Sequence, residues 1–194
     1  NFEYLKKCKI IFVSQDVMTN QQNEAKVKDI YKLVYLIKKK INKKCILVIL
    51  SQLRPGFMSK INFENSRLYY QVETLIFGQA VERALFPERI IVGCSKEMMK
   101  INPYYLKFLK RFNCPIIKMS YQSAEVTKIA LNIFLASSIT TTNILAETCK
   151  LSNGDWEEIK PALKLDKRIG QKAYINPGLG ISGGNIERDI ISLN

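Results

Sequence analysis

Short apolar runs alternate with amphipathic segments over roughly the first 120 residues. Each run is bounded by polar or chain-breaking residues, which is typical of buried strands. Residues 23–42 place apolar side chains at helical spacing, and residues 103–112 also favour a helix. Strands that alternate with helices predict a parallel, doubly wound sheet. The five predicted strands span residues 9–14, 45–51, 68–72, 89–94 and 115–119.

The pattern changes after Tyr121. Residues 123–150 contain no glycine or proline and carry apolar residues at helical period, so they predict one long helix. Residues 155–163 predict a second helix, and residues 173–185 are rich in glycine. We therefore expect two domains: an α/β sheet domain over residues 1–120 and a mainly helical domain over residues 121–194.

Composition narrows the class of protein. The chain is 47% hydrophobic, which is enough for a packed core, and it has no run of eighteen apolar residues. No basic and apolar leader precedes Asn1, so we expect no signal peptide and no membrane partner. The five cysteines form no C-x-x-C pair. Four of them lie in or beside apolar runs, which favours buried thiols in a reducing, cytoplasmic compartment.

The chain has no histidine. Histidine is the commonest metal ligand and the commonest general base, so we expect no metal site. Any chemistry must use carboxylates, lysine, amides, hydroxyls or a cofactor.

The formal net charge is +13, which attracts anions such as nucleotides, phosphorylated sugars and nucleic acid. The lysines at 38–40, with Lys43 and Lys44, are typical of a solvated helix end, where cations suit the helix dipole. No recognisable nucleic-acid module accompanies the charge, so we expect no nucleic-acid partner.

Three polar residues each close a strand-like run: Ser14, Ser51 and Glu73. Ligands of doubly wound sheets bind beyond the carboxyl ends of the strands. These side chains are therefore placed where a ligand would bind, although Glu73 alone would also suit an ordinary surface position.

Polar residues also mark the predicted long helix. Lys128, Asn132 and Asn143 lie within about 60° of one another around its axis. One lysine and two amides on a face can bind an oxyanion or sugar hydroxyls, and they are equally typical of a solvated helix face. Residues 178–184 can bring bare backbone N–H groups to a ligand or form a plain surface turn. Asn185 can cap a following helix.

Six ordered blocks resemble motifs of the nucleotide-sugar 6-dehydrogenase family, which acts on UDP-glucose or GDP-mannose. The spacing inside each block is kept, and together the blocks span nearly the whole chain. They are Ser51–Gly56, Val72–Ala80, Phe86–Gly93, Ala124–Ala136, Asp166–Gly170 and Tyr174–Asp189.

The resemblance implies an activity. Family members oxidise C6 of a UDP- or GDP-linked sugar from alcohol to acid with two NAD molecules, for polysaccharide biosynthesis. By position, Glu73 would be the acid/base that assists hydrolysis, Lys128 and Asn132 would bind substrate oxygen, and Asp189 would be the general-base partner. A homodimer is also implied, formed through the central helical region.

The resemblance implies binding residues as well. Arg168 would reach the sugar nucleotide of a neighbouring subunit. Further substrate contacts fall on Tyr174, Asn176, Gly178, Gly180 and Ile181. Cofactor contacts fall on Ser14, Gln15, Ser51, Gln52 and Arg188.

Several positions depart from the family pattern. Asn185 stands where the family has its catalytic cysteine, and an amide cannot form the thiohemiacetal and thioester of the full reaction. Gln15 and Gln52 replace threonines, Phe77 replaces a glutamate, and Arg188 replaces a lysine. Two hypotheses follow: a dehydrogenase limited to the two-electron step, or a catalytically inactive sugar-nucleotide-binding or assembly subunit.

The resemblance places this chain in the middle of the family's length. The first dinucleotide-binding βαβ unit, with its glycine fingerprint, would precede Asn1, so we expect NAD binding to need that segment. The sheet would then be the second half of a Rossmann-like NAD-binding domain, followed by the central helical domain. The sequence does not choose among sugar nucleotides.

Overall fold

A computed structural model describes residues 2–17, 27–76 and 78–179. The chain divides into two compact units, residues 1–128 and 129–194, which we call unit 1 and unit 2. Gly180, Ile181, Asn185, Arg188 and Asp189 lie outside the described residues, as does Phe77.

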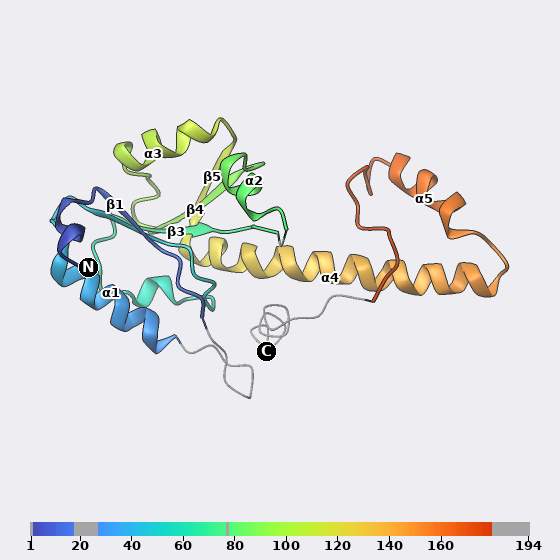
Figure 1. The fold of residues 1–194 in the computed structure, drawn as a ribbon, viewed down its shortest axis with the longest axis horizontal. Helices are drawn as coiled ribbons and strands as arrows, with labels where there is room; N and C mark the ends of the chain where they lie inside the picture. Colours follow the sequence, from blue (N-terminus) through green and yellow to red (C-terminus); the bar gives the residue numbers. More distant parts are fainter. Residues whose placement is uncertain (1, 18–26, 77, 180–194) are drawn as a thin grey trace. The chain divides into compact units, whose positions relative to one another are not determined.

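Unit 1 contains a five-stranded sheet in which the strands follow one another in chain order (Figure 1). Each predicted strand is confirmed to within two residues at either end. The strands are β1 (Ile10–Val13), β2 (Ile46–Ile49), β3 (Leu68–Val72), β4 (Ile90–Cys94) and β5 (Ile116–Ser120).

The sheet is covered on both faces, as the doubly wound prediction requires. Side chains of successive strand residues point to opposite faces. Leu47 and Ile49 of β2 therefore join one core with helix α1 (Lys28–Lys40), which lies within the predicted segment 23–42. Ile46 and Val48 join a second core with helix α3 (Pro103–Leu109) on the other face (Figure 1).

The prediction of an all-parallel sheet is wrong at one strand pair. β1, β2 and β3 pair in parallel and β4 pairs with β5 in parallel, but β3 and β4 are antiparallel. A parallel connection needs a crossover packed on the sheet, usually by a helix. The segment between β3 and β4 holds only α2 (Ala80–Leu85), which has no buried residue. It cannot serve as that crossover, and β4 runs back beside β3.

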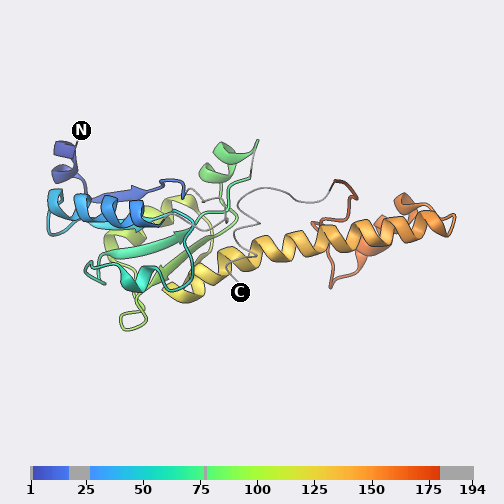
Figure 2. The same ribbon diagram turned by 90° about the horizontal axis from the view of Figure 1, so that it is seen from below.

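The remaining elements agree with the sequence pattern. The predicted helix over 103–112 is α3 extended by a 3₁₀ turn, η3 (Lys110–Phe112). The short helix after the 54–56 break is η2 (Met58–Lys60), and a further 3₁₀ segment, η1 (Phe2–Lys7), precedes β1. The predicted long helix is α4 (Tyr121–Leu151), which begins directly after β5 (Figure 2). In unit 2, α5 (Trp156–Leu165) is capped by Asp155, whose side chain accepts from the Glu157 N–H.

Helix α4 is long and apolar enough to cross a membrane by length and composition alone. Several of its polar side chains form hydrogen bonds with the backbone of their own unit. Glu125 is buried against backbone N–H groups of unit 1, and Thr142 and Asn143 hold backbone groups of unit 2. These contacts attach α4 to backbone segments of both units.

All five cysteines are free. Cys94, at the end of β4, and Cys45, directly before β2, are buried as predicted, and Cys8 and Cys114 are half-buried. Burial raises the pKa of the Cys94 thiol to about 11, because the thiolate would be desolvated in the core. The Cys94 thiol is therefore a packing group and no nucleophile.

Candidate functional site

The carboxyl ends of β1 and β2 are joined by a serine. Ser51 follows β2 and is buried, and its hydroxyl donates to the backbone carbonyl of Gln15 at 2.6 Å. Gln15 and Ser14, which follow β1, are exposed at this edge, and Gln52 is half-buried beside Ser51. Four of the five residues that the resemblance implies for the cofactor thus follow two neighbouring strand ends, which the Ser51 hydroxyl joins, and the fifth, Arg188, lies outside the described residues.

Glu73 and Lys128 meet at the carboxyl end of β3. Glu73 directly follows β3, and its backbone carbonyl accepts a 2.6 Å hydrogen bond from Lys128 Nζ. The Glu73 carboxylate accepts a hydrogen bond from the Leu75 backbone N–H. Because β1, β2 and β3 are parallel, this pair lies at the same edge of the sheet as Ser14 and Ser51. The predicted gathering at this edge is therefore present.

A small cavity of about 190 Å³ lies beside Glu73. Gln71, Glu73 and Thr74 line it from the end of β3, and Arg83 of α2 and Arg89 line it from the other side. Arg83 also donates to the Thr74 carbonyl and pairs with Glu88 at 3.6 Å. The cavity offers both a carboxylate and guanidinium groups next to the strand end.

A buried carboxylate holds the loop after β2, and the sequence reasoning assigned it no role. Glu125 of α4 is fully buried and accepts hydrogen bonds from the backbone N–H groups of Gly56 at 2.7 Å and Met58 at 2.8 Å. Desolvation raises the pKa of its carboxyl group, and the hydrogen bonds from Met58, Gly56 and Phe57 offset part of that rise. Gly56 has φ of +86°, a left-handed conformation that suits glycine.

Glu125 and Lys128 are three residues apart on one helix, so they share a face of α4. One holds the loop after β2 and the other holds the residue after β3. The first turns of α4 therefore position both strand-end loops of the candidate site. The pattern Ala124-Glu125-x-x-Lys128 was the available signal, because it places an acidic and a basic side chain on one face at the start of the predicted helix.

Arg54, in the same loop, supplies a test of whether an anionic cofactor fits. Its Nε is buried and has no hydrogen-bond partner among the described residues. A buried donor left without an acceptor costs about 1–3 kcal/mol. An anionic group at this edge would supply the acceptor, so the residues present fit a phosphate-bearing ligand. An arginine in a loop after a buried strand was the signal that could have identified it.

In unit 2, Asn143 holds the glycine-rich segment. Its Nδ2 donates to the Gly178 carbonyl and its Oδ1 accepts from the Gly178 N–H, both at 2.9 Å. The amide is therefore engaged with the backbone of the glycine-rich segment through one of its donors and its oxygen. The structure thus gives Asn143 a role in positioning a loop, which the two interpretations of the helix face did not include.

Other contacts in unit 2 fix the backbone just before Asn176. The Thr142 hydroxyl donates to the Tyr174 carbonyl at 3.0 Å, and the Trp156 indole donates to the Ile175 carbonyl at 2.9 Å. Lys160 Nζ donates to Asn176 Oδ1 at 3.1 Å. The Tyr174 ring stays half exposed. The backbone of the segment is thus held in place, Ile175 is buried, and the side chains of Tyr174 and Asn176 remain exposed to solvent.

Arg168 and Asn132 complete the predicted set within the described residues. The Arg168 side chain is 90% exposed and pairs with Asp166 at 2.6 Å. That guanidinium lowers the pKa of the Asp166 carboxyl group through its hydrogen bonds. Asn132 is half-buried on α4, one turn after Lys128. Within the described residues, no three Cys, Asp or Glu side chains gather as a metal-binding group would require.

Comparison of the sequence with known proteins identifies a family that this chain matches. Residues 122–194 match the family described as UDP-glucose/GDP-mannose dehydrogenase family, central domain. The UDP-glucose 6-dehydrogenase of Rickettsia felis is 30% identical over 203 residues, which cover 98% of this chain and 44% of the relative. That of Rickettsia bellii is 31% identical over 199 residues, covering 99% and 46%. The chain spans less than half the length of these relatives.

A solved structure agrees on the fold. The UDP-glucose dehydrogenase of the hyperthermophilic archaeon Pyrobaculum islandicum superposes with a TM-score of 0.79 at 23% identity. The match covers 99% of this chain and 46% of that one. The sheet with its following long helix is therefore an arrangement that a nucleotide-sugar dehydrogenase also has.

Proposed function

We propose, from the premise that this chain belongs to the UDP-glucose/GDP-mannose dehydrogenase family, that its full-length protein oxidises C6 of a nucleotide-linked sugar with NAD. The observation that carries the proposal is the joint position of Lys128 and Glu73 at the edge where Ser14 and Ser51 end their strands. Lysine, carboxylate and hydroxyl groups are the donors and acceptors that orienting an alcohol requires.

Two parts of the chain would divide the binding. Residues 1–120 would form the second half of the NAD-binding domain, and residues 121–194 the central helical domain. The orphaned Arg54 donor fits a phosphate of a dinucleotide, and Ser51 would support the same edge by holding the Gln15 carbonyl. Ser14, Gln15, Gln52 and Arg188 would add further contacts. Bound NAD would supply the hydride acceptor.

The substrate alcohol would be handled by this chain's own side chains. Lys128 is held by the Glu73 carbonyl, so its ammonium group would bind the reacting oxygen from a fixed position. Asn132, one turn later, would donate to the same oxygen, and Asp189 would take the proton. The hydroxyl proton would pass to Asp189, and with bound NAD as the hydride acceptor the products would be an aldehyde, NADH and H⁺.

Substrate contacts would come from unit 2. Tyr174, Asn176 and Gly178 lie in the segment that Thr142, Trp156 and Asn143 hold, and Gly180 and Ile181 follow in the chain. Arg168 is exposed, as a residue that reaches a neighbouring subunit would be. A cytoplasmic homodimer is therefore part of the proposal.

Asn185 sets the extent of oxidation. Without a thiol at this position the aldehyde has no nucleophile to form a thioester, so the reaction would stop after two electrons. The expected yield is one NADH per sugar consumed. The alternative, a catalytically inactive subunit, predicts sugar-nucleotide binding without any NADH.

The test is the ratio of NADH formed to sugar consumed by the full-length protein, with UDP- and GDP-sugars as substrates. Lys128→Ala is expected to lower kcat by about 100-fold or more, because the reacting oxygen loses its charged donor. Lys118→Ala, an exposed lysine on β5, is the matched control and should leave kcat unchanged. Asn185→Cys is expected to raise the ratio from one toward two. A ratio of two in the unaltered protein would contradict the two-electron limit, and a ratio of zero with binding intact would establish the inactive alternative.

A further inference from the structure

A second polar cleft opens at the opposite edge of the sheet from Ser14, Ser51 and Glu73. Its volume is about 920 Å³. Lys9 directly precedes β1 and Arg67 directly precedes β3, and both line it. The cleft therefore lies at the amino ends of the parallel strands, away from the edge that the proposed dehydrogenase function uses.

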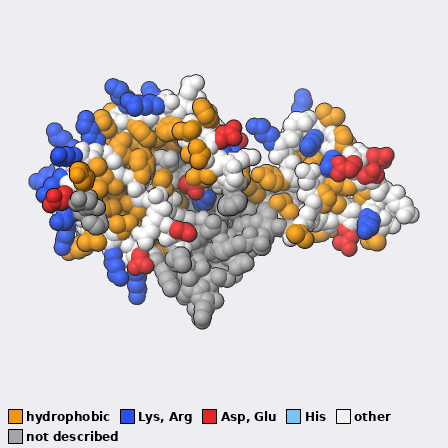
Figure 3. Space-filling view, viewed as in Figure 1, with side chains coloured by type: hydrophobic (Ala, Val, Ile, Leu, Met, Phe, Trp, Pro, Cys, Tyr) orange, Lys and Arg blue, Asp and Glu red, His pale blue; other side chains and the backbone are white. Residues whose placement is uncertain are grey.

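The cleft carries an excess of positive charge. Its lining includes five cationic side chains, Lys7, Lys9, Lys43, Lys44 and Arg67, and one carboxylate, Glu64. Five positive charges less one negative charge leave +4. Within the described part of the chain, no ion pair engages any of the four lysines, whereas Glu64 is committed to Arg67 at 2.9 Å. Figure 3 shows lysine and arginine side chains gathered at the end of unit 1 that holds η1 and the end of α1.

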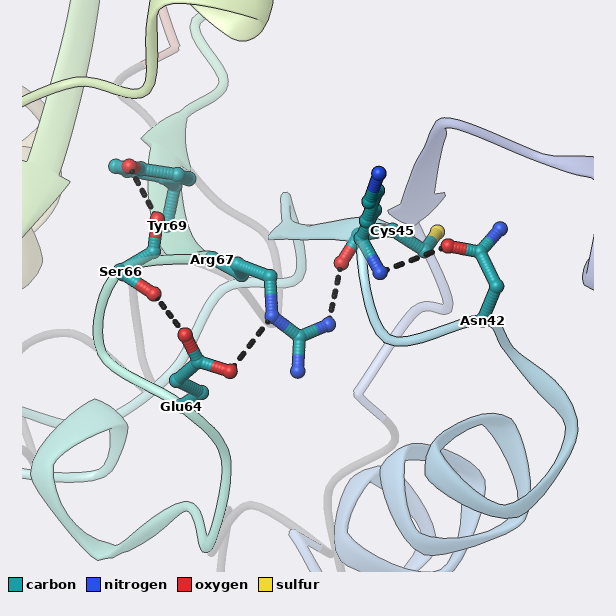
Figure 4. A network of polar contacts seen from close by, with 7 residues as sticks. Asn42, Cys45, Glu64, Ser66, Arg67 and Tyr69 are labelled. Atoms are coloured by element: carbon teal, nitrogen blue, oxygen red, sulfur yellow. Dashed lines mark hydrogen bonds and ion pairs between the residues drawn. The ribbon is translucent and has the colours of Figure 1, made fainter.

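The backbone that carries these cations is held in place by a hydrogen-bond network (Figure 4). Arg67 donates to the Cys45 carbonyl at 2.8 Å, which ties the start of β3 to the start of β2. Asn42 accepts from the Lys44 N–H at 2.8 Å and donates to the carbonyls of Lys6 and Cys8 at 3.0 and 3.1 Å. The segments before β1, β2 and β3 are therefore fixed to one another.

None of this network uses a lysine side chain. Lys44 takes part only through its backbone N–H, and Lys43 does not take part. The lysine side chains are exposed around a preformed frame. They can bind an anion without breaking a contact that the fold depends on, and they can be removed experimentally without dismantling it.

An aromatic ring adds a second kind of contact. Tyr104 lines the cleft with 48% of its surface exposed, and Lys9 Nζ lies 5.3 Å from the centre of its ring. An exposed ring beside lysines that have no ion pair among the described residues offers a stacking surface next to phosphate-binding groups.

We propose that this cleft binds a nucleoside triphosphate, with the phosphates on the lysines and the base against Tyr104. A nucleoside triphosphate carries about four negative charges at neutral pH, since its terminal phosphate contributes nearly two. That charge matches the +4 excess of the lining. Pockets that hold one small molecule measure roughly 300–1,000 Å³, and this cleft lies in that range.

A polynucleotide fits the same cleft less well. Proteins that bind single strands use a groove that follows the backbone over several nucleotides. Here the cations converge from three strand starts on one concave site. Binding that strengthened with oligonucleotide length, and exceeded that of ATP, would overturn the proposal in favour of nucleic acid.

The experiment is calorimetric titration of the full-length protein with ATP, with tripolyphosphate, and with single-stranded oligonucleotides of 4 and 12 nucleotides. ATP is expected to bind saturably at one site, and the double substitution K43A/K44A is expected to weaken ATP binding by about tenfold. The matched control is K110A/K118A, which removes two exposed lysines elsewhere on unit 1 and should change the Kd by less than twofold. Tyr104→Ala should weaken the binding of ATP but leave the binding of tripolyphosphate unchanged.

Three results would overturn the proposal. The first is the absence of saturable ATP binding. The second is an equal loss of ATP affinity in K43A/K44A and K110A/K118A. The third is an equal loss of affinity for ATP and for tripolyphosphate in Tyr104→Ala. Competition by UDP-sugar or NAD would assign the observed binding to the proposed dehydrogenase site. Failure of the cleft therefore stays separate from failure of the dehydrogenase function, which is measured by NADH yield.

Discussion

Helix α4 holds backbone segments in both units, but it does so in different surroundings. In unit 1, Glu125 is fully buried and accepts from two backbone N–H groups of the loop after β2. In unit 2, Asn143 makes a two-point contact with Gly178 that is exposed to solvent. A lost hydrogen bond in the interior leaves a desolvated group, whereas water replaces a lost bond at the surface. The Glu125 contacts should therefore contribute more to the free energy of unfolding than the Asn143 contacts, although each side chain makes two hydrogen bonds to backbone.

The largest expected effect follows from removing Glu125. Glu125→Ala leaves the N–H groups of Gly56 and Met58 without their acceptor, so we expect a loss of roughly 3 kcal/mol in the free energy of unfolding. Urea denaturation measures it. Glu125→Gln keeps one acceptor oxygen and should lose about half as much. A loss below about 0.5 kcal/mol for the alanine variant would show that the loop finds other hydrogen-bond partners. Burial would then not make the Glu125 contact stronger than the exposed Asn143 contact.

The second largest expected effect on stability concerns the close packing of β4 against α4 in unit 1. A Cβ at Gly93 of β4 would lie 2.8 Å from the Cβ of Ala124 and 3.2 Å from the Cβ of Tyr70. Gly93→Ala is expected to destabilise the protein by about 2 kcal/mol, because the sheet and α4 would have to separate.

The control for Gly93 lies in unit 2. A Cβ at Gly178 would meet nothing within 4 Å, and Gly178 does not have a positive φ. Gly178→Ala should therefore change stability by less than about 0.5 kcal/mol. Thermal unfolding of both variants compares them, and an equal loss in the two would contradict the contrast in packing.

The pH dependence of stability should show a smaller effect, because titration changes only the charge of Glu125 and leaves its partners in place. Burial raises the folded-state pKa of this carboxyl group above the value of 4.5 that applies when it is exposed. The folded state then holds more protons than the unfolded state between the two pKa values. The contribution is present below pH 4.5 and is lost as pH rises through the folded pKa. Denaturation at several pH values should show this fall, and Glu125→Gln should remove it.

Much of the architecture was predictable from local pattern. The strands are short apolar runs that fill two cores, and α4 is a long segment free of glycine and proline. The antiparallel pairing of β3 and β4 was not predictable from the strands themselves, because it depends on whether α2 packs on the sheet.

The candidate site divides in the same way. Ser14, Ser51 and Glu73 were identified because strand ends can be located from sequence. Glu125 and Arg54 were missed because their roles depend on groups brought near by folding; the partners of Glu125 lie 69 and 67 residues away in sequence. The contact of Asn143 with Gly178 was missed for the same reason, since its partner is 35 residues away.

The smallest expected effect is the loss of the exposed contact in unit 2. Asn143→Ala removes both hydrogen bonds to Gly178, and water can replace them, so we expect a loss of about 0.5–1 kcal/mol at most. Hydrogen exchange at the Gly178 amide should accelerate in this variant while exchange in the β2 and β3 amides stays unchanged. Asn143→Asp keeps the acceptor for the Gly178 N–H and should preserve most of the protection. A destabilisation by Asn143→Ala as large as that of Glu125→Ala would mean that solvent exposure does not set the weight of these contacts, and that the glycine-rich segment is as firmly held as the loop after β2.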